Sequence, residues 1–355
     1  MKDLESLRRE IDKIDAQILE LLWKRFQVVK EVGEFKNRTK SPIFLPDREK
    51  RLIARLTSLA QEKGWDLTQE EIKAIYSEII AVSRNRERRE RVAYLGPQGS
   101  YTHQGAVQKF GSLTRYLPLT SIEAVFKAVE SGEAKYGVVP IENNTHGQVG
   151  LTLDGLRKYD VKIVGEICTD IHHSFASVQD EVEKIERIYS HPQAYHQCIG
   201  FLESHGLLDR EFIPVDSTSA AAKKAVEDPK SGAICSKIAA KLYNLPLLFE
   251  KIEDNKANRT RFVILSNYFP PASGEDKTSV IATTYNRPGA LVELLQRFKE
   301  LEINLLKIES RPLKDDTFEN VSFYLEFEGH ISNPKISQLV EGEQMKILGS
   351  YPREC

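Results

Sequence analysis

Residues 4–35 read LESLRREIDKIDAQILELLWKRFQVVKEVGEF, and this stretch decides the fold of the first part of the chain. Apolar residues recur in it every seven positions, at Leu4, Ile11, Ile18 and Val32, with a second apolar series between them. The spacing predicts a long helix that packs along its length against partner helices. Arg25 occupies a position of the first series, where a guanidinium is costly unless an anion meets it. Two interpretations are open: a cavity that binds an acidic ligand, or a polar residue that fixes the helix register or reaches solvent.

Two further helices are predicted, and each places polar residues on a face that is otherwise apolar. Pro46 stands at a favoured first helical position, and the apolar stripe that follows it extends back by one turn to Arg48 and Glu49. The next helix starts with a capping box, and its apolar stripe continues into Ser83 and Glu87. Because all three helices contribute such residues, the sequence favours a lined pocket in a small helical bundle.

Length and composition predict an ordinary soluble protein. The chain has 355 residues, enough for two or three domains, and a net charge of −2, which argues against a nucleic-acid-binding protein. The basic stretch 84–91 contains acids and is interpreted as a solvated helix end. The sequence has neither a secretion signal nor an apolar run that could span a membrane, so a cytoplasmic location is expected. The four cysteines lack a CxxC pair and metal-ligand spacing, and we expect reduced thiols and no metal site.

The pattern changes after the helical part of the chain. From residue 91 onward, short apolar runs alternate with helical segments, which predicts an α/β domain with a mainly parallel sheet. A stretch with Pro and Gly at 268–277 is predicted to be a linker. The remaining residues predict the order βαββαβ, which is that of a ferredoxin-like unit. The predicted domains are therefore 1–90, 91–267 and 278–355.

Neutral hydrogen-bonding residues follow several predicted strands of the α/β domain. Loops after the carboxyl ends of strands are where open α/β sheets bind ligands, although Asn, Ser and Thr are also common turn formers. The glycine-rich turn 96–100 lacks the patterns of nucleotide-binding loops. The candidate site residues are Ser100, Thr102, Asn143, Asn144, Thr145, Ser190, Gln193, Gln197, Thr260, Arg261 and Phe262.

Several motifs, taken in chain order, resemble those of one enzyme family. The stretches that resemble signatures of prephenate dehydratase are 92–97 (VAYLGP), 137–143 (GVVPIEN), 190–193 (SHPQ) and 260–262 (TRF). Residues 288–291 (PGAL) and 308–312 (IESRP) resemble an ACT regulatory domain, and 7–36 resembles the all-helical chorismate mutases. Over nearly its whole length, the chain resembles the bifunctional chorismate mutase/prephenate dehydratases.

The resemblance to chorismate mutase implies an all-α domain whose three helices intertwine with those of a partner in a homodimer. Chorismate rearranges to prephenate in a unimolecular reaction that needs no nucleophile, metal or cofactor. The protein holds the reactive conformer and stabilises the negative charge that develops on the ether oxygen. The implied catalytic residues are Arg8 from the partner chain, Arg25, Lys36, Arg48, Glu49, Ser83 and Glu87.

Each of these residues has an implied role. The arginines bind the two carboxylates of chorismate, because a guanidinium pairs with a carboxylate through two parallel hydrogen bonds. Lys36 and Glu87 donate to the ether oxygen, and Glu49 binds the C4 hydroxyl. Since a glutamate donates only when it is protonated, we predict mutase activity that declines as the pH rises, with a flatter profile for Glu87→Gln.

The resemblance to prephenate dehydratase implies two lobes, as in periplasmic binding proteins, with the site in the cleft between them. Prephenate loses CO2 and hydroxide as its ring becomes aromatic, so no cofactor is expected. The resemblance makes Thr260 the key hydroxyl. For Arg261, a substrate carboxylate and a structural ion pair remain equal alternatives, and His146 departs from the family pattern near the expected cleft mouth. The residues implied to hold the substrate are Asn143, Thr145, Ser190 and Gln197.

The resemblance to an ACT domain implies that L-phenylalanine binds there and inhibits the dehydratase. Pro and Gly at a helix N-terminus leave backbone amides that can receive a carboxylate. The last predicted helix, around 332–341, is shorter than is usual in the family. The implied effector-binding residues are Asn286, Pro288, Gly289, Ala290 and Leu291, with Glu309, Ser310, Arg311 and Pro312 from a partner chain.

Two other functions remain open from the sequence. A dehydratase could retain a mutase-like domain only for dimerisation, or the chain could be a non-catalytic amino-acid sensor. A sensor gives no reason for the basic residues of the helical domain. The expected partners are chorismate, prephenate, L-phenylalanine and further copies of the chain in a homodimer or larger homo-oligomer, without nucleic acid or membrane.

Overall fold

The computed structural model describes residues 3–145, 147–312 and 320–355. By its internal contacts the chain forms two compact units. The first consists of Met1–Glu90 with Gly111–Arg115, and the second of Arg91–Phe110 with Tyr116–Cys355. His146, which the sequence placed near a cleft mouth, lies outside the described residues.

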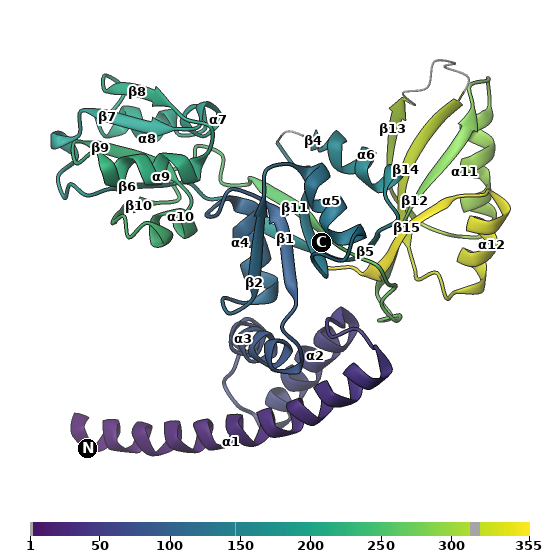
Figure 1. Ribbon diagram of the computed structural model, residues 1–355, viewed down its shortest axis with the longest axis horizontal. Coiled ribbons are helices and arrows are strands. Elements are labelled where there is room, and N and C mark those ends of the chain that lie inside the picture. The colour runs from purple at the N-terminus through teal and green to yellow at the C-terminus, as the bar shows by residue number, and fades with distance from the viewer. Residues whose placement is uncertain (1–2, 146, 313–319) are drawn as a thin grey trace. The chain divides into compact units, whose positions relative to one another are not determined.

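The first unit contains the three predicted helices, α1 (Leu4–Thr39), α2 (Pro46–Lys63) and α3 (Gln69–Glu87). The heptad stretch forms one continuous helix, and Figure 1 shows α1 in purple extending past the two shorter helices. The capping box of α3 is present: Thr68 and Glu71 each accept a hydrogen bond from the other's backbone amide.

The apolar face of α1 is largely exposed in a single chain. Side chains along its N-terminal half are 44–64% exposed, and these are Leu4, Leu7, Ile11, Ile14, Ile18 and Leu21. Toward its C-terminal end α1 packs more closely, and Gly33 and Lys36 are buried. An exposed apolar stripe of this length is typical of a surface that another chain covers.

The second unit begins with an α/β lobe. Its elements are β1 (Arg91–Leu95), α4 (Tyr101–Phe110), β2 (Arg115–Leu119), α5 (Ile122–Glu130), β3 (Tyr136–Asn143), β4 (Gly147–Gln148), α6 (Gly150–Lys158), β5 (Lys162–Asp170) and, after a long excursion of the chain, β11 (Arg259–Ser266). The core of this lobe forms where α5 and α6 pack on the sheet through residues such as Phe126, Leu156 and Val139.

The excursion between β5 and β11 forms a smaller lobe. Its elements are β6 (Ser174–Ser177), the short 3₁₀ helix η1 (Val182–Lys184), β7 (Arg187–Ser190), α7 (Pro192–His196), α8 (Ile199–Ser204), β8 (Glu211–Pro214), α9 (Thr218–Glu227), β9 (Ser231–Cys235), α10 (Lys237–Leu242) and β10 (Leu247–Glu250). The five strands form their own sheet in the order β10-β6-β9-β7-β8. Two lobes are therefore present, as the sequence implied.

The last segment has the predicted order βαββαβ. Its elements are β12 (Asp276–Tyr285), α11 (Ala290–Glu300), β13 (Leu305–Pro312), β14 (Asn320–Glu328), α12 (Pro334–Gly342) and β15 (Lys346–Pro352). These four strands are antiparallel neighbours in the order β13-β14-β12-β15, and β15 then pairs with β5. The last segment thus extends the sheet of the first lobe to ten strands. The predicted linker is shorter than expected, because β12 already begins at Asp276.

The prediction of a mainly parallel sheet is wrong. β11 runs antiparallel to both of its neighbours, β3 and β5, because the chain returns through it from the smaller lobe. The smaller sheet is mixed as well: β7 is parallel to β8 and β9, whereas β6 is antiparallel to β9 and β10. Apolar runs identify buried strands but do not give their direction.

Candidate active sites

A cavity of about 570 Å³ lies among the three helices of the first unit. Six of the seven predicted mutase residues line it, namely Arg25, Lys36, Arg48, Glu49, Ser83 and Glu87. The seventh, Arg8, lies on the exposed N-terminal part of α1. Arg25 therefore lines a cavity, and of the two interpretations of its position in the seam the structure favours this one.

The cavity is strongly basic. Its lining contains six basic side chains and two carboxylates, with apolar residues such as Val28, Val32 and Leu52 between them. The basic residues that the sequence did not predict are Arg51, Arg55 and Arg84. An excess of positive charge in a partly enclosed space suits a ligand with more than one negative charge.

Arg84 is a correction to the sequence analysis. Its stretch was interpreted as a solvated helix end, but Arg84 is 8% exposed and lies 3.3 Å from the Glu49 carboxylate. Its guanidinium also stacks over the Phe44 ring. Arg84 follows the buried Ile80 by four residues, so helix periodicity places it on the apolar face of α3, and this position was the signal for its burial.

Hydrogen bonds hold the basic groups of the cavity in place. Nζ of Lys36 donates to Oε2 of Glu87 at 2.7 Å, and both side chains are only about one-tenth exposed. Nη1 of Arg25 donates to Oγ of Ser83 at 2.5 Å. Burial lowers the pKa of Arg25, and the nearby charge of Arg48 lowers it further. A buried guanidinium with a second one beside it is stabilised by an anion.

Gly33 allows α1 to approach α3 at this point. A Cβ atom on Gly33 would lie 2.7 Å from Cα of Glu87 and 2.8 Å from its carbonyl oxygen. The close approach of the two helices brings Lys36 within hydrogen-bonding distance of Glu87. The position of this pair therefore depends on the absence of a side chain one turn earlier in α1.

The pH dependence of the mutase reaction tests the role of Glu87. If Glu87 donates to the ether oxygen, it must be protonated, so mutase kcat/KM falls as the pH rises. We expect Glu87→Gln, which carries an amide donor at every pH, to give a flatter profile between about pH 5 and about pH 9. The measurement is the initial rate of chorismate loss across this range. A wild-type profile that does not change with pH would contradict the role.

In the second unit, strand pairing brings Thr260 and Asn143 together. The two residues are register partners on β11 and β3, and Nδ2 of Asn143 donates to Oγ1 of Thr260 at 2.8 Å. The backbone amide of Thr145 donates to Oδ1 of Asn143 at 2.9 Å, which orients the amide group. Since the threonine oxygen accepts this bond, its own proton remains to be donated. Three of the predicted dehydratase residues thus form one cluster.

A second cluster, which the sequence analysis missed, lies where the chain passes from β5 to the smaller lobe. Nε2 of His173 donates to Oε1 of Gln197 at 2.9 Å, and its Nδ1 lies 2.6 Å from the hydroxyl oxygen of Tyr101. Both oxygens of Glu253 are engaged, by the ring of His172 and the backbone amide of His173. Burial lowers the pKa of His173, so its ring is neutral at physiological pH. The sequence signal was the adjacent pair His172–His173, which lies in the segment that follows β5.

The two clusters are connected through the backbone. The amide of Ile171 donates to the carbonyl of Asn258 at 2.8 Å, and the Asn258 side chain accepts a hydrogen bond from Asn143. Both segments that join the two lobes, after β5 and before β11, therefore carry residues of the candidate site.

Other predicted dehydratase residues have structural roles in this conformation. Ser100 accepts a hydrogen bond from the amide of His103 at the start of α4, and Thr102 is buried. Phe262 is 1% exposed and packs beside Gly105, so its prediction as a substrate contact is not supported. Asn144 accepts a hydrogen bond from the backbone amide of Arg259. Ser190 is buried and donates to the carbonyl of His191. Gln193 lies in α7, and its backbone amide donates to the His191 ring.

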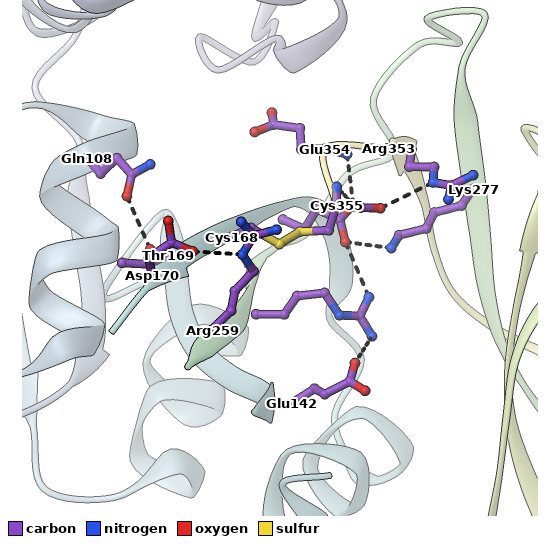
Figure 2. Close-up of a disulfide and its surroundings, with 12 residues drawn as sticks. Gln108, Glu142, Cys168, Thr169, Asp170, Arg259, Lys277, Arg353, Glu354 and Cys355 are labelled. Atoms are coloured by element: carbon purple, nitrogen blue, oxygen red, sulfur yellow. Dashed lines mark hydrogen bonds and ion pairs between the residues drawn. A yellow bond between two sulfur atoms is a disulfide. The ribbon is translucent and has the colours of Figure 1, made fainter. Parts of the chain in front are cut away.

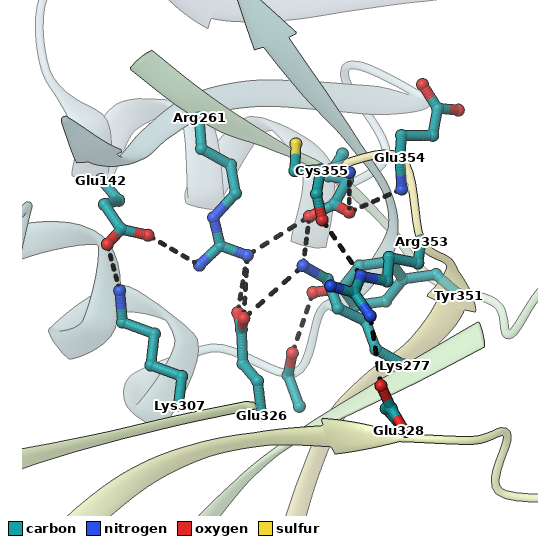
Figure 3. A network of polar contacts seen from close by, with 12 residues as sticks. Glu142, Arg261, Lys277, Lys307, Glu326, Glu328, Tyr351, Arg353, Glu354 and Cys355 are labelled. Carbon is teal, nitrogen blue, oxygen red and sulfur yellow. Dashed lines mark hydrogen bonds and ion pairs between the residues drawn. The ribbon is translucent and has the colours of Figure 1, made fainter. Parts of the chain in front are cut away.

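Arg261 forms the structural ion pair that was one of its two alternatives. Figure 3 shows its guanidinium between Glu142 of the first lobe and Glu326 of the last segment. Nη1 lies 2.8 Å from Glu326 and 3.2 Å from Glu166, and Nη2 lies 3.2 Å from Glu142. Lys277 also contacts Glu166, at 2.6 Å. Burial alone would lower the pKa of Arg261, but the charge of Glu326 raises it above its ordinary value. The guanidinium is thus committed to protein carboxylates.

The predicted effector residues lie in two places of the last segment. Asn286, Pro288, Gly289, Ala290 and Leu291 form the turn before α11 and its start, whereas Glu309, Ser310, Arg311 and Pro312 lie on β13. β14 separates β13 from β12, so one chain does not bring the two sets together. Arg311 is a correction: it pairs with Asp154 of α6 through two hydrogen bonds, at 3.0 and 2.8 Å, and is not free for an effector.

The cysteines are also a correction. Cys168 and Cys355 form a disulfide, whereas four reduced thiols were expected. Cys198 and Cys235 are free and buried, and burial raises the pKa of Cys235 to about 12. Within residues 3–145, 147–312 and 320–355, the structure contains no group of three or more potential metal ligands. No helix in these same ranges has the length and apolar character required to cross a bilayer.

Comparisons with known proteins identify the family of this chain. The chorismate mutase type II family model matches residues 7–88, and the prephenate dehydratase model matches residues 92–268. A bifunctional chorismate mutase/prephenate dehydratase of Aquifex aeolicus is 40% identical, over 99% of both chains, and that of Pseudomonas aeruginosa is 38% identical, over 99% of this chain and 98% of its own. A crystal structure of the prephenate dehydratase of Arthrobacter aurescens with L-Phe matches with a TM-score of 0.68 and 32% identity, covering 74% of this chain and 90% of that one.

Proposed function

This chain belongs to the bifunctional chorismate mutase/prephenate dehydratases, and from that premise we propose which of its residues carry out the two reactions. It rearranges chorismate to prephenate, and it decarboxylates and dehydrates prephenate to phenylpyruvate. The observation that carries the proposal is the basic cavity in which Arg25, Lys36 and Glu87 meet.

In the mutase reaction, the cavity holds the chorismate dianion in its reactive conformer. Arg25 and Arg48 bind carboxylates, and Lys36 donates to the ether oxygen as negative charge develops there. Glu87 is a second donor when it carries a proton, and Glu49 accepts from the C4 hydroxyl. Arg84, buried against Glu49, fixes the orientation of that carboxylate and adds positive charge. The apolar wall supplied by Val28, Val32 and neighbouring residues limits the water in the site.

A second copy of the chain completes the mutase site. The exposed apolar stripe of α1 fits the corresponding stripe of a partner, and Arg8 lies on that same exposed part of the helix. In an intertwined homodimer, Arg8 of each chain enters the cavity of its partner and binds the second end of the substrate. The pairing of two stripes removes apolar surface from water, which stabilises the dimer.

In the dehydratase reaction, the Thr260 hydroxyl faces the leaving group. Asn143 donates to the Thr260 oxygen, so the threonine proton points away and is available for the departing C4 hydroxide. Because a threonine hydroxyl is a weak acid, its main contribution is a positioned hydrogen bond, which strengthens as charge develops on the leaving oxygen. Gln197, oriented by His173, and Thr145 hold the substrate, and closure of the two lobes excludes water.

L-phenylalanine inhibits the dehydratase through the βαββαβ segment, which we propose to be an ACT domain. The related dehydratase of Arthrobacter aurescens was crystallised with L-Phe, which supports this assignment. The turn 286–289 presents backbone amides at the N-terminus of α11, where a carboxylate is favourable. Glu309 and Ser310 of a partner chain lie on the other side of the effector. A cytoplasmic location fits the substrates of this route and remains part of the proposal.

Substitution of Gly289 tests the effector site. Gly289 has φ = +87°, a conformation that an L-residue adopts only with strain, so Gly289→Ala distorts the turn that receives the carboxylate. We expect the L-phenylalanine concentration for half-inhibition of the dehydratase to rise by at least about tenfold, the effect of roughly 1.4 kcal/mol in binding. Gly132→Ala is the matched control, since Gly132 also has a positive φ and open space around it. Unchanged inhibition in Gly289→Ala together with a normal melting temperature would contradict the site.

The direct test of the function as a whole is incubation with chorismate. Prephenate appears first and phenylpyruvate follows, and L-phenylalanine suppresses the second product without suppressing the first. If prephenate forms but phenylpyruvate does not, the mutase activity is supported and the dehydratase activity is contradicted. If neither prephenate nor phenylpyruvate forms, the result would favour the alternative of a non-catalytic amino-acid sensor.

A further inference from the structure

The Cys168–Cys355 disulfide joins the first lobe of the second unit to its last segment, close to the proposed dehydratase site. Cys168 lies on β5 of the first lobe, and Cys355 lies just after β15 of the regulatory segment, 187 positions later in the chain. Their Cα atoms are 6.0 Å apart. Figure 2 shows the bond bridging the two parts of the sheet. Neither of the proposed reactions uses these two sulfur atoms.

The disulfide lies beside the strand that carries Thr260. In the register between β5 and β11, Cys168 is opposite Arg261, and the next residue, Thr169, is opposite Thr260. A displacement of β5 at Cys168 therefore acts on the direct neighbour of the proposed catalytic hydroxyl. Because hydrogen-bonded strands move together, the position of this bond can affect how Thr260 is held.

The segment around Cys355 also holds the ion-pair network of Arg261. The backbone amides of Glu354 and Cys355 donate to Oε1 of Glu166, at 2.8 and 3.0 Å. Oε2 of the same carboxylate receives Lys277 at 2.6 Å and Arg261 at 3.2 Å. The segment after β15 therefore fixes Glu166, Glu166 fixes Arg261, and Arg261 is adjacent to Thr260 in β11. Release of this segment removes two hydrogen bonds from a fully buried carboxylate, which is costly.

The bond is accessible to a reagent in solution. Cys355 is exposed and Cys168 is partly exposed, and both line a surface cavity of about 560 Å³ with Lys256 and Arg259. The other two cysteines are fully buried and lie in the smaller lobe. A thiol reagent can therefore distinguish the two pairs without unfolding the protein. Disulfides of cytosolic proteins, where present, are usually transient and catalytic or redox-sensing.

We propose that Cys168 and Cys355 form a thiol–disulfide exchange site that sets the rate of the dehydratase reaction. A dithiol attacks one sulfur as its thiolate, the S–S bond breaks, and the second thiol of the reagent closes its own disulfide. Two electrons and two protons pass to the protein, which then has two free thiols. Release of the segment after β15 loosens Glu166 and Arg261, and Thr260 loses its fixed position. A small disulfide reagent reverses the reaction.

This inference rests on the proposed placement of the dehydratase hydroxyl at Thr260, and it predicts different behaviour for the two activities. The oxidised enzyme has the higher dehydratase kcat, and reduction lowers it by about tenfold, since displacements of an ångström in a site cost up to about 100-fold. The substrate contacts remain, so KM changes little. The mutase rate does not change, because its cavity lies in the other unit.

The experiment uses the full chain, treated with either oxidised or reduced dithiothreitol. A chromogenic disulfide reagent counts reactive thiols without denaturant, and we expect none in the oxidised protein and two in the reduced protein. Both activities are then measured in each state. Cys355→Ser has the low dehydratase kcat in both states, whereas the matched variant Cys198→Ala keeps the full response of the wild type.

The results that would contradict this inference differ from those that would contradict the dehydratase assignment. The inference is wrong if mass spectrometry of the oxidised protein finds no linked peptide containing Cys168 and Cys355, or if excess dithiol leaves the bond intact in the folded protein. It is also wrong if the two states have the same dehydratase kcat. Absence of phenylpyruvate in both states would instead overturn the dehydratase assignment itself.

Discussion

Arg25→Ala lowers the mutase kcat/KM by about 10²–10³-fold, the usual cost of removing one preorganised donor to a charge in a site. Arg25 is the arginine that stands within the apolar seam of α1, and its Nη1 is held by Ser83. Three of the other cavity cations already pair with protein carboxylates: Lys36 with Glu87, Arg51 with Asp47 and Arg84 with Glu49. The rate of chorismate loss measures the effect, and the conversion of added prephenate is expected to stay at the wild-type level.

Two further variants sharpen this prediction. Arg25→Lys keeps the charge but loses the planar two-pronged geometry, so its mutase activity lies between those of wild type and Arg25→Ala. Arg38→Ala, an exposed position in the last turn of the same helix, is the control for loss of one positive charge from α1. Full mutase activity in Arg25→Ala would contradict the role of Arg25, whereas a wild-type chain that does not consume chorismate would show that the helical domain serves only for dimerisation.

Thr260→Ala removes the proposed donor to the leaving hydroxide and lowers the dehydratase kcat by about 10²–10³-fold. Loss of the hydroxyl also leaves the amide group of Asn143 without one of its acceptors. Thr260→Ser is the matched variant, because it keeps the oxygen and recovers most of the rate. Formation of phenylpyruvate from prephenate is the measurement, with the mutase rate and the binding of L-phenylalanine as unchanged references. Equal rates for alanine and serine at this position would contradict a role of the hydroxyl.

The helical domain was largely predictable because its information is local. A seven-residue repeat specifies one long helix, and polar residues that interrupt apolar stripes at fixed offsets identify a cavity. The prediction is wrong at Arg84, which lies on the apolar face of α3, four residues after Ile80. A charged residue in a basic stretch is expected in solvent, and only the tertiary contact with Glu49 and Phe44 explains its burial.

The second unit was less predictable because its decisive contacts are long-range. The register of β3 and β11 joins Asn143 to Thr260 across more than a hundred residues, and the direction of β11 follows from the path of the chain through the smaller lobe. The two alternatives for Arg261 could not be separated without knowing that Glu326, on β14 of the last segment, lies across from it. The pairing of Cys168 with Cys355 is also a long-range contact, and the spacing of the cysteines in the sequence gives no indication of it.

The return of the chain through β11 makes the smaller lobe an insertion between adjacent strands. Asp170 and Arg259, at the two junctions, are register partners, and their side chains lie 2.8 Å apart. The chain therefore enters and leaves the smaller lobe at two neighbouring positions of the sheet. A chimaera that exchanges the smaller lobe for that of a relative, with both joints at these two residues, would leave the strand pairing of the parent sheet intact.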